Sequence, residues 1–100
     1  MEKILNQNMP VKELSRIELI NSLQSYLDRQ ISGKNLLELW EQSSQDFQPI
    51  YYNLFHLVCD EDIRLKDDEY SKRQIQQLEL LIEGMKKNES IDILKEISFL

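Results

Sequence analysis

The spacing of the apolar residues limits the fold of this chain more than any other feature, because it follows the period of an α-helix. The longest example lies in residues 68–87, where apolar side chains recur at i, i+3, i+6, i+7 and i+10. These are Ile75, Leu78, Leu81, Ile82 and Met85. Such a stripe predicts a helix with one buried face. The acidic start of the segment and its basic end, "KKN", both suit the helix dipole.

A similar stripe runs through residues 12–30 and predicts an earlier helix. Its members are Leu14, Ile17, Ile20, Leu23 and Leu27. The sequence "ISGKN" interrupts this pattern, since Gly33 readily takes the backbone conformations that a helix end requires. Either Ser32 or Asn35 can cap the helix that follows.

Two further helices are expected before residue 60. A short one over 34–44 turns Leu36, Leu37 and Trp40 inward, and another over 49–59 begins near Pro49. The second is apolar on most of its circumference, which predicts a central place in the bundle.

The remaining segments lack a long periodic pattern. Residues 1–11 are expected to be a loosely ordered lead-in, with room for a short helical turn, and residues 60–67 a loop that can contain a turn of helix. Either Asp67 or Asp68 can cap the next helix. The end of the chain can form a short fifth helix that buries apolar side chains. These are Ile91, Leu94 and Ile97.

Length and composition favour one all-α domain spanning residues 1–100. A chain of 100 residues with 41% hydrophobic content can bury a single core. It contains two glycines and two prolines, and its many Leu, Ile, Glu, Gln and Lys residues favour helix over strand. We therefore expect a compact bundle of about four helices, with short extra helices left open at the ends.

The charge of the chain favours a basic partner. A formal net charge of −6 is unsuited to direct binding of nucleic acid, whose affinity depends largely on neutralised phosphates. The sequence shows no targeting segment, and none of its apolar runs approaches the roughly 20 residues needed to cross a bilayer. We expect a soluble, cytoplasmic protein without a membrane partner, in which the lone Cys59 forms no internal disulfide.

No residue pattern indicates catalysis or a cofactor. His56, Cys59 and Asp60 could approach one another on a helix, but no second Cys or His exists to complete a zinc site. Because its neighbours are apolar, Cys59 is expected to be buried and inert. The segment "DEDIRLKDDEYS" fails as a calcium loop, since Leu65 stands where a glycine is needed. We therefore predict no catalytic residue, no metal ligand set and no enzyme.

Aromatic and acidic residues are the remaining candidates for binding. The aromatic residues of the two middle helices, which are Trp40, Tyr51, Tyr52 and Phe55, are expected mainly in the core. Because adjacent residues cannot share one helix face, at least one of the two tyrosines is expected near the surface. Between Asp60 and Tyr70 six acidic side chains surround two basic ones. A solvated loop would explain them, but their mutual repulsion favours a basic partner that relieves it.

Three segments together resemble the small immunity proteins of the colicin D type, including those that accompany contact-dependent growth-inhibition toxins. They are "LINSLQSYLDRQISGKNLLELWEQ", "NLFHLVCDEDIR" and "YSKRQIQQLELLIEGM". The match covers about residues 17–86 and consists of helix lengths and an acidic, Asp-rich segment after the third helix. The resemblance implies a compact helical bundle.

The resemblance also implies a stoichiometric inhibitor that covers the active site of a cognate nuclease toxin, in many cases one that cleaves tRNA. Acidic side chains would then replace RNA phosphates against lysines and arginines of the toxin. The candidate partner-binding residues are Asp60, Glu61, Asp62, Asp67, Asp68, Glu69 and Tyr70. Tyr70 would supply an aromatic anchor.

The function expected from the sequence is therefore that of a cytoplasmic, monomeric bacteriocin-type immunity protein. The alternative is a non-enzymatic helical adaptor or regulatory module, in which the apolar face of the third or fourth helix pairs with another helix. A homodimer is one form that such a module can take. A small enzyme that uses His56 is the third and weakest hypothesis.

Overall fold

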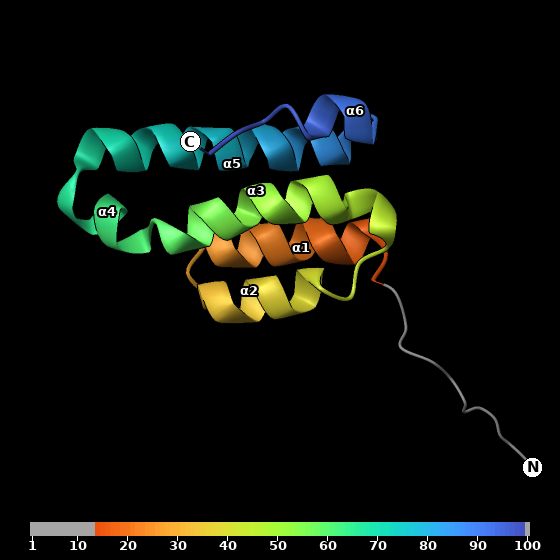
Figure 1. The fold of residues 1–100 in the computed structure, drawn as a ribbon, viewed down its shortest axis with the longest axis horizontal. Helices are drawn as coiled ribbons and strands as arrows, with labels where there is room; N and C mark the ends of the chain where they lie inside the picture. Colours follow the sequence, from red (N-terminus) through yellow and green to blue (C-terminus); the bar gives the residue numbers. More distant parts are fainter. Residues whose placement is uncertain (1–13, 100) are drawn as a thin grey trace, which may run out of the picture.

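The computed structural model describes residues 14–99 and is all-α over that range. Its helices, shown in Figure 1, are α1 (Arg16–Leu27), α2 (Gly33–Trp40), the 3₁₀ turn η1 (Gln45–Phe47), α3 (Gln48–Cys59), α4 (Glu61–Lys66), α5 (Asp68–Lys86) and α6 (Ile91–Leu94). The expected bundle is confirmed. The lead-in predicted for residues 1–11 lies outside the described residues. Within residues 14–99 no helix is both long and apolar enough to cross a membrane.

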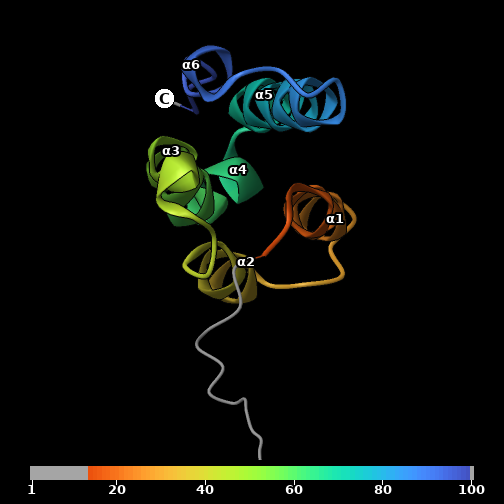
Figure 2. The same ribbon diagram turned by 90° about the vertical axis from the view of Figure 1, so that its right-hand side faces the viewer.

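The four longer helices enclose a common interior, which Figure 2 shows nearly end-on. Helix α1 packs against α5 and α2, and α2 also packs against α3. Each of these helices contributes side chains to one apolar core. The core consists of Leu19, Leu23, Leu36, Trp40, Ile50, Leu54, Leu57, Leu78, Leu81, Ile82, Met85, Leu94 and Phe99.

Side-chain caps fix where several helices begin. Ser15 caps α1 in a reciprocal capping box with Glu18, and Ser32 caps α2 by accepting from the backbone N–H of Asn35. Of the two candidate caps of α5, Asp67 is the one used, since it accepts from two backbone N–H groups of the first turn. These polar side chains satisfy N–H groups that the helix itself leaves without partners.

Left-handed residues end two of the long helices. Arg29 (φ 63°) follows α1 and Asn88 (φ 61°) follows α5. In each turn the next residue donates its N–H back to the helix, from Gln30 to Ser25 and from Glu89 to the carbonyl of Gly84. This is the Schellman arrangement, normally formed with glycine.

The role expected of Gly33 is wrong, because its φ is not positive. It occupies the first turn of α2, where an added Cβ would lie 2.5 Å from Cγ1 of Val58 and 2.8 Å from Oε2 of Glu61. The glycine is therefore needed for the close approach of α2 to α3, not for the turn.

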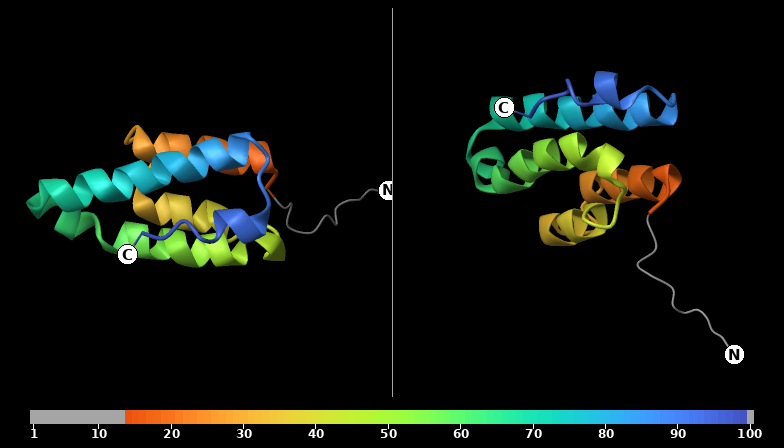
Figure 3. Two further views of the ribbon diagram at one scale, coloured as in Figure 1. Left: turned by 90° about the horizontal axis from the view of Figure 1, so that it is seen from above. Right: turned by 45° about the vertical axis from the view of Figure 1, so that its right-hand side comes forward.

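The C-terminal strap, residues 95–99, runs back from α6 beside α3 and α5 (Figure 3). The amide of Asn53 in α3 donates to two carbonyls of the strap. The amides of Gln77 and Gln74 in α5 donate to two others. Phe99 is buried in the core. Helix α6 itself is shorter than the expected fifth helix, and of its apolar residues Leu94 is fully buried.

Several sequence expectations are corrected by the structure. Residues 61–66 form helix α4, so the helical turn allowed within the loop expected at 60–67 takes up most of that segment, and α2 ends at Trp40 rather than at residue 44. Ile17 is 70% exposed, because it lies on the opposite side of α1 from the buried Leu19 and Leu23. The third helix is buried on one side only, so Phe55 is not a core residue. These differences arise where the apolar stripe is short or ambiguous.

Candidate partner-binding site

The six acidic residues predicted to bind a partner lie on α4, at the start of α5, and at the junctions before these helices. Helix α4 has acidic residues in its first turn and basic residues in its last, which suits its dipole. Local charge alone does not explain why α4 is helical, because a helix of six residues is only marginally stable by itself. Tertiary hydrogen bonds hold it.

The guanidinium of Arg64 provides the main attachment of α4. It donates to the carbonyl of Leu57 in α3 (2.5 Å), to Oε1 of Gln74 in α5 (2.6 Å) and to the hydroxyl of Tyr26 in α1 (2.8 Å). One side chain therefore joins α4 to three other helices. Of the two basic residues in this acidic segment, Arg64 points inward, and Lys66 is the one left exposed.

Asp60 and Tyr70 lie against each other inside the same network. The Tyr70 hydroxyl donates to Oδ2 of Asp60 (2.5 Å), and Nε2 of Gln74 also donates to that oxygen (3.0 Å). The hydrogen bond to Asp60 raises the pKa of Tyr70 above its ordinary value. Both residues were predicted to face a partner, but Oδ2 of Asp60 and the hydroxyl of Tyr70 are occupied by contacts within the protein.

The remaining acids divide into two groups. Glu61 accepts a hydrogen bond from the hydroxyl of Tyr26 (2.5 Å), and Asp67 caps α5. The other three, Asp62, Asp68 and Glu69, are exposed, and their carboxylates make no hydrogen bond or ion pair with the described residues. We call these three residues the acidic surface.

Burial is the largest cause of a raised pKa at Tyr26. The hydrogen bond to the Glu61 carboxylate acts in the same direction, whereas the nearby positive charge of Arg64 lowers the pKa. A phenol that donates to a carboxylate is easier to keep neutral than one in water. Tyr26 therefore stays a hydrogen-bond donor under all ordinary conditions.

An apolar strip lies on the outer side of α3. Tyr52 is 63% exposed and Phe55 is 48% exposed. They share a helix face with Cys59, which is also exposed, so the expectation of a buried cysteine is wrong. We call Tyr52, Phe55 and Cys59 the α3 strip. The core-facing residues of α3 occupy the opposite side, which explains why residues 14–99 leave the strip exposed.

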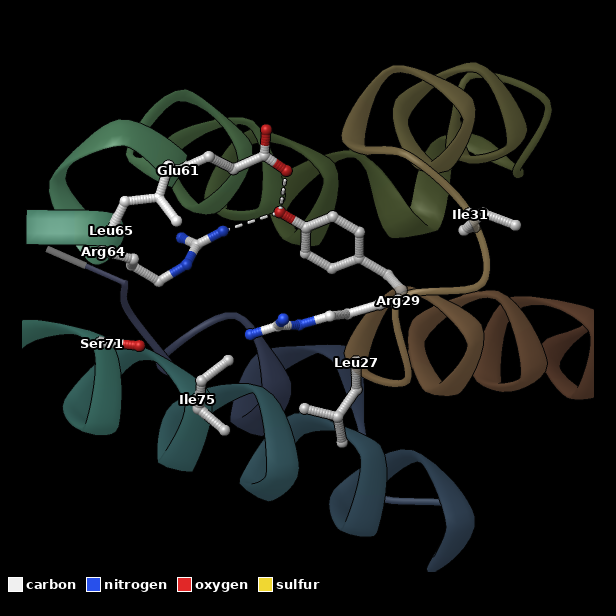
Figure 4. Close-up of a pocket in the computed structure, with 9 residues that line it drawn as sticks. Leu27, Arg29, Ile31, Glu61, Arg64, Leu65, Ser71 and Ile75 are labelled. Carbon is white, nitrogen blue, oxygen red and sulfur yellow. Dashed lines mark hydrogen bonds between the residues drawn. The ribbon is translucent and has the colours of Figure 1, made fainter. Parts of the chain in front are cut away.

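A cleft of about 540 Å³ opens between the end of α1, helix α4 and helix α5 (Figure 4). Four apolar residues, two arginines, two hydroxyl groups and one carboxylate line it. They are Tyr26, Leu27, Arg29, Ile31, Glu61, Arg64, Leu65, Ser71 and Ile75.

The sequence reasoning did not identify Tyr26, Arg29 or Gln74. One signal for Gln74 was available, because it stands four residues before Leu78 and so continues the buried stripe of α5. A polar residue at a core position indicates hydrogen bonds to other buried groups. Tyr26 and Arg64 are 38 residues apart, and no local pattern links them.

The structure brings together no metal-binding group in residues 14–99, where no three His, Cys, Asp or Glu side chains are placed to hold an ion. His56 and Cys59 are both exposed on α3. Comparisons with family models, curated proteins and solved structures give no match to this chain.

Proposed function

We propose that the protein is an immunity protein that binds the catalytic domain of a basic bacterial nuclease toxin, most simply a tRNA-cleaving one, and blocks its active site. The observation that carries the proposal is the acidic surface, whose three carboxylates have no cation to pair with in the described chain. The resemblance to colicin D-type immunity proteins supplies the class of partner.

Unpaired carboxylates on adjoining helices repel one another, and a cationic partner relieves that repulsion. Asp68 and Glu69 in the first turn of α5 are partly balanced by the helix dipole, but Asp62 on α4 adds a further negative charge to the same segment. A nuclease active site that holds RNA phosphates provides the complementary positive charge. The acidic residues would occupy the places of those phosphates.

Charge of this kind chiefly accelerates association. Steered complexes form at rates on the order of 10⁸ M⁻¹s⁻¹ at low salt, and the rate falls as salt screens the charges. Lasting affinity needs desolvated anchors near the centre of an interface, where aromatic side chains are enriched. Tyr52 and Phe55 of the α3 strip meet that description better than Tyr70, whose hydroxyl is bound to Asp60.

The proposal is tested by titrating the protein with the C-terminal domain of whatever protein the gene immediately upstream encodes, and measuring association rate and ribonuclease activity at two salt concentrations. A triple variant, Asp62→Asn with Asp68→Asn and Glu69→Gln, should associate on the order of tenfold more slowly at low salt and show a flatter salt dependence.

The matched control removes three exposed charges elsewhere, by Asp46→Asn, Glu79→Gln and Glu96→Gln. Both variants have the same net charge, so only the position of the charges differs. Equal rates for the two triples would show that the acidic surface does not steer binding. Absence of a one-to-one inhibited complex would remove the proposal itself. We place the complex in the cytoplasm, with the free protein a monomer.

A helical adaptor or homodimer is the second candidate, and the α3 strip favours it, because exposed apolar residues in helical register suit pairing with another helix. Sedimentation equilibrium separates the two functions. Self-association that is insensitive to salt and is abolished by Phe55→Ser would support the adaptor, whereas a monomer at all concentrations would exclude the homodimer.

A further inference from the structure

The cleft between α1, α4 and α5 has the size of a small-molecule site. Its volume of about 540 Å³ lies within the range of about 300–1,000 Å³ typical of ligand pockets. It is separate from the acidic surface, since none of Asp62, Asp68 and Glu69 lines it. A ligand site in this cleft is therefore independent of the proposed function.

Apolar side chains form opposite walls of the cleft. Leu27 and Ile31 come from the end of α1 and the turn after it, and Leu65 and Ile75 come from α4 and α5 (Figure 4). Leu65 in particular is a large apolar side chain that the bundle leaves exposed. A ligand with an apolar body would cover these side chains and remove them from water.

Arg29 is the cation without a partner in the cleft. Its side chain extends across the opening between Arg64 and Ile75 (Figure 4). It makes no hydrogen bond or ion pair with any residue in 14–99. The left-handed turn at Arg29 (φ 63°) fixes where this side chain leaves the backbone. A guanidinium can bind a carboxylate with two parallel hydrogen bonds.

Two further residues beside Arg29 have unused hydrogen-bond donors. Arg64 uses both hydrogens of Nη1 and one of Nη2, which leaves one hydrogen on Nη2 and the hydrogen on Nε. The hydroxyl of Ser71 has no hydrogen-bond partner among the described residues. The cleft therefore offers several donors that are not used within the protein.

The charge of the cleft is opposite to that of the whole protein. Two guanidiniums, of Arg29 and Arg64, face one carboxylate, of Glu61, which gives a net charge of +1 in a chain whose formal charge is −6. Glu61 is already bound by the Tyr26 hydroxyl. One excess positive charge suits a monoanion, and the apolar walls exclude an anion that is polar throughout.

We propose that this cleft binds a small organic carboxylate with an apolar body. The carboxylate pairs with the guanidinium of Arg29, within reach of the donors of Arg64 and Ser71. The body lies against Leu27, Ile31, Leu65 and Ile75.

The test is an NMR titration of the labelled full-length protein with octanoate below its micelle concentration, beside the neutral analogue octanamide. Octanoate should shift the amide signals of the cleft, such as those of Ser71 and Ile75, in a saturable way. Octanamide should bind at least tenfold more weakly, because it cannot pair with Arg29.

Two variants with the same change of charge complete the design. Arg29→Gln should weaken octanoate binding about tenfold, and Lys72→Gln, at an exposed position outside the cleft lining, should leave it unchanged. Neither side chain makes a hydrogen bond with the described residues, so the unfolding midpoint of each variant should match that of the unmodified protein. Absence of saturable shifts, equal binding of octanamide, or unchanged binding by Arg29→Gln would each overturn the proposal.

Discussion

Replacing Gln74 by leucine should test whether the polar network around α4 stabilises the fold. Gln74 is 1% exposed, and its amide is the only side chain among residues 14–99 that bonds to both Arg64 and the C-terminal strap. Leucine has a similar size and the same preference for helix, so the change removes hydrogen bonds while altering packing little.

The expected loss follows from the groups left without partners. The buried carbonyl of Phe99 loses its donor at 2.6 Å, and Arg64 loses one of its three acceptors, also at 2.6 Å. An unsatisfied buried group costs about 1–3 kcal/mol. Asp60 also loses a hydrogen bond, but it is partly exposed and can turn to water. Allowing for the apolar area that leucine buries, we expect the free energy of unfolding to fall by about 2–4 kcal/mol.

Urea unfolding measures this change, followed by the fluorescence of Trp40 and by far-UV circular dichroism. Trp40 is the one tryptophan in the chain and is fully buried, so its emission reports on the core. Gln76→Leu, at an exposed position two residues along α5, is the matched control and should change stability by less than about 0.5 kcal/mol. If the two variants unfold at the same urea concentration, the network adds no net stability.

Three further changes test other parts of the fold. Gly33→Ala should lower the free energy of unfolding by about 1–3 kcal/mol, because the new methyl group meets the stiff side chain of Val58; an unchanged urea midpoint would mean that α2 can move away freely. Phe99→Ala should cost about 3–5 kcal/mol by leaving a cavity in the core, and a smaller loss would show that the strap is not part of it. The third change concerns pH. Since the pKa of Tyr26 is raised above its ordinary value of about 10, its contribution to stability is complete below about pH 10 and is lost as the pH rises further. Between about pH 8 and about pH 11, the free energy of unfolding measured in urea should therefore fall less for Tyr26→Phe than for the unmodified protein. An equal fall in both proteins would contradict the assignment.

The sequence predicted the parts of the fold that local patterns determine. The buried stripe of α5 from Leu78 to Met85, the inward position of Trp40 and a cap at Asp67 or Asp68 all follow from helix periodicity and capping chemistry. Which of the two aspartates caps α5 is decided by the structure alone. The boundaries agree to within a few residues where a glycine, a proline or a cap marks them.

The parts that were missed depend on contacts between distant residues. Helix α4 has no apolar stripe, and it is held by Arg64 through hydrogen bonds to α1, α3 and α5. The exposure of Phe55 depends on which side of α3 the other helices cover, and its own neighbours in sequence do not reveal this. Likewise, the division of the acidic residues into internal and exposed groups requires knowing that Asp60 lies against Tyr70.

The C-terminal strap has a consequence for how the chain is made. A ribosome releases the chain from its N-terminus, so residues 95–99 are the last of the described residues to emerge. The finished fold nevertheless needs them, because Phe99 fills part of the core and three side-chain amides of α3 and α5 donate to carbonyls of the strap. The nascent helices can form and touch, but the side chains of α3 and α5 that the strap covers stay exposed until residues 95–99 have left the ribosome. During that interval apolar side chains and unpaired amides are exposed, and a chaperone would bind the surface that Phe99 later covers.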